Sequence, residues 1–143
     1  MDAMAALLVR DAGAFDVVVT TNMFGDILSD EASELSGSLG LAASINAGEG
    51  HCMAQAQHGS APDIAGKDLA NPLSLVLSAG MLLGWLGRKN GNQSFLAAQS
   101  ALEQAVDALV QDPATRTRDL GGALGTKAVT ADPVGRAFSA PDW

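Results

Sequence analysis

The chain has 143 residues, of which 48% are hydrophobic and 17% charged, a balance typical of a folded globular protein. Its net charge is −8, and its eight lysines and arginines form no cluster. Nucleic acid is therefore excluded as an expected partner, because phosphate binding needs a basic surface. The single cysteine, Cys52, excludes an internal disulfide and a cysteine-based zinc site.

No membrane segment or leader is predicted. The longest apolar stretch, residues 73–86, is interrupted by serine and glycine and is too short to span a bilayer. The first residues already show a helical pattern, and this pattern contains an acid. They lack the basic flank of a signal peptide. We therefore expect a cytoplasmic protein.

The first part of the chain predicts a helix, a strand and a second helix. Residues 3–9 favour a helix that is already under way at the first residue, which suggests a preceding segment. Residues 15–21 are apolar and β-branched, as in a buried strand. Asn22 is the predicted cap of a helix over 23–35, and several glycines make 37–50 a turn-rich connection.

The second part predicts a short strand, a loop and two long helices. The strand is expected at 52–57, and the helices over 72–87 and 93–110, the latter amphipathic. A further short helix is predicted at 133–138. Helices alternating with strands indicate an α/β protein. Two strands are few for a self-sufficient sheet, so we expect the others upstream.

Two acids of the predicted second helix, Asp26 and Asp30, are four residues apart and therefore project from one face. Like charges at this spacing repel each other by about 0.2–0.5 kcal/mol. A divalent cation would turn that repulsion into attraction, and Mg²⁺ and Mn²⁺ prefer carboxylate oxygens. Alternatively, Asp26 complements the helix dipole and Asp30 faces solvent.

A second motif combines glycine, proline and one acid in an irregular segment that ends at the next helix. Its Gly and Pro positions argue against regular structure. Taken alone, it is also compatible with a structural turn in which Asp63 caps its own backbone. The segment reads His58-Gly59-Ser60-Ala61-Pro62-Asp63-Ile64-Ala65-Gly66-Lys67, and Ala70-Asn71-Pro72 follows.

Together these motifs resemble the isocitrate/isopropylmalate dehydrogenase family of β-decarboxylating dehydrogenases. The resemblance runs from Asp2 to about Phe138, but it covers less than half of a typical subunit. It implies a partial isopropylmalate-dehydrogenase-like α/β fold, with helices packed on an incomplete sheet. Residues 1–37 would end the dimerisation and metal-binding domain, and 38–143 would form the C-terminal part of the nucleotide-binding domain.

The resemblance also implies ligands for a catalytic Mg²⁺ or Mn²⁺. Asp26 and Asp30 match the two helix acids that bind the cation in one subunit. Asp2 matches a third acid, which the partner subunit of a homodimer supplies. Asp2 would therefore serve the metal of the neighbouring subunit.

On the same resemblance, the glycine–proline segment is the adenosine-binding loop, and it replaces the Rossmann glycine fingerprint. An acid at Asp63 accepts hydrogen bonds from the ribose hydroxyls and repels a 2′-phosphate, which implies NAD. Asn71 offers an amide to the adenine edge, and Asp119 matches a C-terminal signature near this site. The implied cofactor residues are His58, Gly59, Ser60, Ala61, Pro62, Asp63, Ile64, Ala65, Gly66 and Asn71.

The implied reaction is oxidation of a 2-hydroxy acid such as 3-isopropylmalate, followed by loss of its β-carboxylate. No residue of this chain matches the family's acid/base pair or its substrate arginines, so no catalytic residue is assigned and the chain alone is expected to be inactive. The chain also departs from the family, because Gln55-Ala56-Gln57 stands where Glu-Pro-Val is usual. A non-catalytic NAD- or metal-binding remnant, or a regulatory subunit, remains the alternative.

Overall fold

The computed structural model describes residues 2–131. It divides the chain into two compact units, Met1–Leu39 and Gly40–Trp143. The division falls two residues beyond the boundary expected at 37/38.

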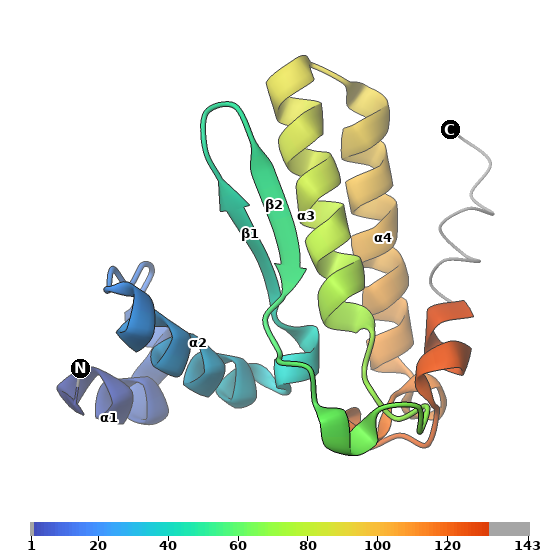
Figure 1. Cartoon of the computed structure of the whole chain (residues 1–143), viewed down its shortest axis with the longest axis horizontal. Helices are drawn as coiled ribbons and strands as arrows, with labels where there is room; N and C mark the ends of the chain where they lie inside the picture. The colour runs from blue at the N-terminus through green and yellow to red at the C-terminus, as the bar shows by residue number, and fades with distance from the viewer. Residues whose placement is uncertain (1, 132–143) are drawn as a thin grey trace. The chain divides into compact units, whose positions relative to one another are not determined.

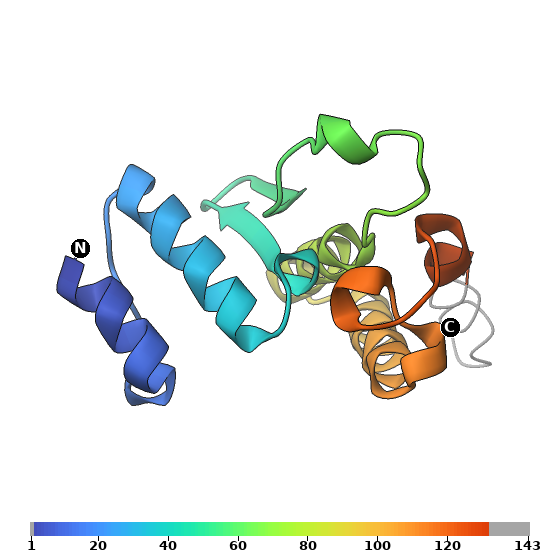
Figure 2. The ribbon, with the colours of Figure 1, turned by 90° about the horizontal axis from the view of Figure 1, so that it is seen from below.

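Unit 1 is a pair of helices, α1 (Asp2–Asp11) and α2 (Asn22–Ser36), which lie side by side in Figure 2. Both predicted helices are confirmed, α1 with two more residues at its C-terminal end. Leu8 of α1 and Leu28 of α2 are the buried apolar side chains of the pair. Asn22 is the first residue of α2, and Thr21 occupies the cap position without a side-chain capping bond. The expected capping role of Asn22 was therefore wrong.

The strand predicted at 15–21 is absent from the described structure. Residues 17–21 have no regular secondary structure, and Val17 and Val19 are 80% and 92% exposed. The β-branched composition is that of a strand, but a strand also needs a neighbour that accepts its main-chain hydrogen bonds. Within residues 2–131, no strand pairs with this segment.

Unit 2 begins with an antiparallel hairpin of β1 (Ala43–Ala47) and β2 (Cys52–Ala56), in which Ala43 lies opposite Ala56 and Ala47 opposite Cys52. The strand expected at 52–57 is thus confirmed as β2. β1 was missed, because the glycines on both sides of it predicted a turn-rich connection.

Helix α3 (Leu73–Asn90) lies along the hairpin in Figure 1, and two of its buried serines bind the strand backbone. The Ser78 hydroxyl donates to the carbonyl of Gln55 at 2.7 Å and accepts from the N–H of Ser44 at 3.0 Å. Ser74 donates to the carbonyl of Ala42 and accepts from the N–H of Gln57. The serines thereby satisfy backbone groups of the two strands and of the residues directly next to them, Ala42 and Gln57, on the side that faces α3.

Helix α4 (Gln93–Gln111) runs back beside α3 (Figure 1), and Gly87 of α3 allows the close approach. A Cβ at Gly87 would lie 2.8 Å from Cδ2 of Leu96 and 3.1 Å from the carbonyl oxygen of Asn92, whereas one at Gly84 would meet only the movable ends of the Gln99 and Arg88 side chains. The side chain of Asn92 caps α4 by accepting from the N–H groups of Ser94 and Phe95. Both long helices were predicted, and Gly91, in the left-handed conformation, ends α3.

The core of unit 2 lies where α3, α4 and the C-terminal segment meet. It consists of Leu73, Val106, Leu109 and Val129, all almost completely buried. Residues 126–131 are helical, and the helix predicted at 133–138 lies outside the described residues. Helices packed on a small two-stranded sheet confirm the expectation of a partial α/β fold. None of the helices among residues 2–131 is long and apolar enough to cross a membrane.

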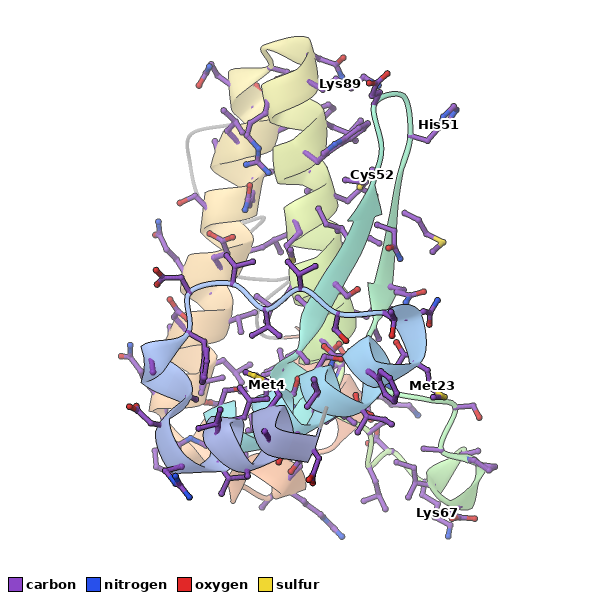
Figure 3. All side chains as sticks on the ribbon, turned by 90° about the vertical axis from the view of Figure 1, so that its left-hand side faces the viewer. Met4, Met23, His51, Cys52, Lys67 and Lys89 are labelled. Carbon is purple, nitrogen blue, oxygen red and sulfur yellow. The ribbon has the colours of Figure 1, made fainter. Side chains whose placement is uncertain are left out.

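The tip of the hairpin is fastened to the end of α3 by Lys89. Its ammonium group donates to the carbonyl of Gly50 at 2.7 Å and lies 4.6 Å from the centre of the Trp85 ring. Figure 3 shows Lys89 at the hairpin tip, where His51 points away from the helix. A cation over an aromatic ring adds to the hydrogen bond, so both ends of the hairpin are held against α3.

Candidate cofactor and metal sites

The paired carboxylates lie in unit 1. Asp26 and Asp30 are both exposed, one helical turn apart on α2. Asp2 is exposed in the first turn of α1. No group of three His, Cys, Asp or Glu within residues 2–131 is placed to hold a metal ion. One copy of the chain therefore offers two neighbouring carboxylates on α2. These fit an oxygen-preferring divalent cation, which would need its remaining ligands from elsewhere.

The predicted nucleotide loop connects β2 to α3 in unit 2. Its centre is a single 3-10 turn, η3 (Pro62–Ile64), which follows Ala61 in the left-handed conformation at φ 41°. Main-chain bonds close the turn, from the N–H of Ile64 to Ala61 and from that of Ala65 to Pro62, at 3.1 and 3.2 Å. The turn is therefore formed by backbone bonds, and the Asp63 side chain is exposed at its surface.

The side chain of Asn71 is engaged inside the protein. Asn71 is 8% exposed, and its Oδ1 accepts from the N–H of Leu73 at 2.9 Å, at the start of α3. Its Nδ2 donates to Oδ2 of Asp119 at 2.9 Å. Adenine recognition by Asn71, as the resemblance implies, would therefore fall to its main chain or to the remaining N–H of the amide.

The last residues of the loop are also hydrogen-bonded to the segment 125–131, which is helical from Thr126 onward. Asp68, in the left-handed conformation at φ 55°, accepts at Oδ1 from the N–H of Lys127 at 2.9 Å. The Thr126 hydroxyl donates to the carbonyl of Ala70 at 2.5 Å. A Cβ at Gly125 would lie 2.5 Å from Oδ2 of Asp68, so only glycine fits there. In Figure 2 the loop runs from the hairpin towards this segment.

Sequence reasoning missed Asp68, and it noted Asp119 only through a signature. Asp68 carries no local signal, because its partner lies 59 residues further along the chain. The left-handed conformation of Asp68, which Asp and Asn tolerate better than other side chains, becomes visible only in the structure. Gln55, the departure from the family pattern, lies on β2 with its side chain exposed.

Comparison with known proteins identifies the class to which this arrangement belongs. The family model described as isocitrate/isopropylmalate dehydrogenase matches residues 1–136. The chain therefore belongs to the isocitrate/isopropylmalate dehydrogenase family, a family of β-decarboxylating dehydrogenases.

Individual relatives agree with this assignment. The chain is 45% identical over 127 residues, 89% of its length, to a 3-isopropylmalate dehydrogenase of Saccharolobus solfataricus. It is 49% identical over 130 residues, 91% of its length, to an isocitrate/homoisocitrate dehydrogenase of Thermus thermophilus. Isocitrate dehydrogenase from Methylococcus capsulatus has a similar structure, with a TM-score of 0.78 and 36% identity over 95% of the chain.

These relatives are much longer than the chain. The matched region makes up 38% of the Saccharolobus protein, 36% of the Thermus protein and 39% of the Methylococcus protein. The chain thus spans little more than a third of each relative.

Proposed function

We propose that the chain is the C-terminal part of an NAD-dependent oxidoreductase that oxidises and decarboxylates a 2-hydroxy acid with the help of Mg²⁺ or Mn²⁺. In this proposal, unit 1 ends a dimerisation and metal-binding domain and unit 2 carries the adenosine half of the NAD site. The whole enzyme is a homodimer in the cytoplasm and acts on a small acid such as 3-isopropylmalate. The family membership supports the reaction class.

The exposed Asp63 carries the cofactor proposal. Its carboxylate lies on a turn that the backbone holds closed, so its two oxygens remain available to the ribose hydroxyls. The same charge disfavours a 2′-phosphate, because two anions in contact repel each other. Residues 58–66 supply the surrounding surface, since their glycines and small side chains permit a dinucleotide to approach the backbone.

Asp26 and Asp30 carry the metal proposal. Both are exposed and lie one turn apart on a rigid helix, and Asp2 of the partner chain completes the protein ligands. When bound, the cation supplies a Lewis acid that polarises the 2-oxygen of the substrate. The two α2 carboxylates hold the cation in place and offset its charge.

One observation favours the second candidate, a non-catalytic NAD- or metal-binding remnant or a regulatory subunit. Gln55 is neutral where the family usually has glutamate, and it lies exposed on the strand that leads into the nucleotide loop. A subunit that binds the cofactor without reducing it has no need of that charge.

Fusion to a longer relative tests the proposed activity. The portion of the Thermus isocitrate/homoisocitrate dehydrogenase outside the matched region is joined to this chain, and NADH formation is followed with isocitrate, homoisocitrate, 3-isopropylmalate or tartrate plus Mn²⁺. We expect turnover with at least one acid and none by the chain alone. A folded, NAD-binding fusion that forms no NADH would favour the remnant, and turnover by the isolated chain would contradict the assignment of catalysis to absent residues.

A matched pair of variants in the same fusion tests the metal ligands. Asp30→Asn keeps the shape of the side chain but removes its charge, and we expect it to raise the Mn²⁺ concentration at half-maximal activity by about 10-fold or more. Asp107→Asn, on the exposed face of α4, removes one charge from unit 2 and is expected to change nothing. Equal Mn²⁺ requirements in the two variants would overturn the role of Asp30.

A further inference from the structure

We infer that Asp119 is a positioning residue for the cofactor: it holds Asn71 in the orientation that fixes the end of the nucleotide loop, residues 58–71. The inference rests on the proposed NAD site. It assigns a function to a carboxylate that lies 48 residues from Asn71 in sequence and outside the loop.

The hydrogen bonds of Asn71 determine which way its amide points. The N–H of Leu73 can only donate, so it must face the oxygen Oδ1, at 2.9 Å. The nitrogen Nδ2 then faces Oδ2 of Asp119, which can only accept when it is a carboxylate, also at 2.9 Å. The two contacts agree on one orientation, and that orientation joins the last turn of the loop to the first turn of α3.

The space around this pair is restricted by Gly40. A Cβ at that position would lie 2.7 and 2.8 Å from Nδ2 and Cβ of Asn71, and 2.8 Å from Oδ2 of Asp119. These distances are too short for any side chain. A glycine at position 40 thus leaves room for Asn71 and Asp119 to meet at the base of the hairpin, and Asn71 is 8% exposed there.

Asp119 is presented by a rigid turn. It lies in η5 (Arg118–Leu120), where the N–H groups of Leu120 and Gly122 donate to the carbonyl of Thr117 at 3.1 and 2.8 Å. Gly121 ends this turn in the left-handed conformation, at φ 80°. Because Thr117 itself is completely buried, the turn is anchored to the interior of unit 2.

Two hydrogen bonds therefore hold the C-terminal end of the loop, one from Asn71 to Asp119 and one from Lys127 to Asp68. The exposed turn that carries Asp63 precedes them in the loop. A loop fixed at its exit loses less conformational freedom when a ligand binds, and this strengthens binding without adding any contact to the ligand. Asp119 acts on NAD in this way, through Asn71, and does not touch it.

The test compares the full chain with its variants Asp119→Ala, Asp119→Asn and Asp107→Ala. Two measurements are made: the Kd for NAD by calorimetry, and the amide hydrogen exchange of residues 58–73 without ligand. We expect Asp119→Ala to raise Kd by about 10-fold and to speed exchange in this segment, because the charge-assisted hydrogen bond to Asn71 and the loop order that it supports are lost. Asp119→Asn keeps an acceptor oxygen and should restore both values to within about 3-fold, and Asp107→Ala should match the unaltered chain.

Each result decides between the two hypotheses. Unchanged exchange and unchanged Kd in a folded Asp119→Ala chain would overturn the positioning role and leave the proposed function standing. If the unaltered chain binds no NAD, the proposed function fails, and the exchange measurement alone still decides whether Asp119 orders the loop. Loss of the fold in both Asp119→Ala and Asp119→Asn, seen as faster exchange in α4 as well, would also contradict a positioning role.

Discussion

Ser78 of α3 forms hydrogen bonds with the hairpin backbone that a neighbouring strand would otherwise supply. Ser78 is completely buried. Its hydroxyl donates to the carbonyl of Gln55 and accepts from the N–H of Ser44, and it also lies 2.8 Å from the carbonyl of Ser74. A helix side chain thus satisfies one backbone group in each strand. No apolar side chain of similar size can do this, because those backbone groups would be left buried without a partner.

We predict that Ser78→Ala lowers the free energy of unfolding by about 1–3 kcal/mol, since it leaves two strand backbone groups unsatisfied. Urea denaturation followed by circular dichroism measures the change. Ser94→Ala, at an exposed position near the start of α4, serves as the control and should stay within about 0.5 kcal/mol of the unaltered chain. Equal stability of the two variants would show that water replaces the hydroxyl of Ser78.

At the scale of the element, α3 illustrates two different uses of glycine. A Cβ at Gly80 would meet Leu102 at 3.8 Å, an ordinary contact, whereas one at Gly87 would lie 2.8 and 2.9 Å from Leu96 and 3.1 Å from the carbonyl of Asn92. Gly87 is therefore required by the close approach of α4. Gly80 has no such steric reason.

The two alanine variants of these glycines are expected to change stability in opposite directions. Gly80→Ala should raise the free energy of unfolding by about 0.5–1 kcal/mol, because alanine loses less backbone entropy in a helix. Gly87→Ala should lower it by about 1–3 kcal/mol through overpacking against Leu96. Thermal unfolding of both variants provides the comparison, and a gain in stability for Gly87→Ala would contradict the close packing of α4 against Gly87.

Elements governed by local pattern were predictable from the sequence. The apolar run after Pro72 in α3, the 3.6-residue periodicity of α4 and the Gly/Pro punctuation around η3 all act within a few residues, although α3 continues past its predicted end at Gly87 to Asn90. The segment 15–21 was not predictable in the same way. Its composition favours a strand, but a strand exists only where a neighbour pairs with it, and the sequence of the segment says nothing of that neighbour.

The residues of the candidate site also differ in whether a local pattern reveals them. The exposed Asp63 turn and the spacing of Asp26 and Asp30 followed from short motifs, and their roles in NAD and metal binding remain predictions. The partners of Asn71 and Asp68 were missed, because they lie 48 and 59 residues away in the chain and produce no periodic signal. Only folding brings these residues together.

At the scale of the whole molecule, the two units differ in how much apolar surface they bury. Unit 2 has a cluster of four almost fully buried side chains. Unit 1 has Leu8 and Leu28, and its apolar side chains Val17, Val19 and Met23 are more than half exposed. A helix pair with so small a core contributes little free energy of its own.

We therefore predict that unit 1 opens at lower free energy than unit 2 in the isolated chain. Native-state hydrogen exchange should find faster exchange in the amides of α1 than in the middle of α3 and α4. Joining the chain to the remaining portion of a longer relative should slow exchange in unit 1 and leave α3 almost unchanged. Equal protection of α1 and α3 in the isolated chain would mean that the two units unfold together.

Cofactor choice tests the central claim most directly, because it depends on the exposed carboxylate of Asp63 in the nucleotide loop. The Kd values of the full chain for NAD and NADP are measured by calorimetry, alongside those of Asp63→Ala. We predict that the chain binds NAD at least about 10-fold more tightly than NADP, and that Asp63→Ala brings the two values to within about 3-fold of each other. Equal binding of NAD and NADP by the unaltered chain, or a preference that survives in Asp63→Ala, would contradict the account.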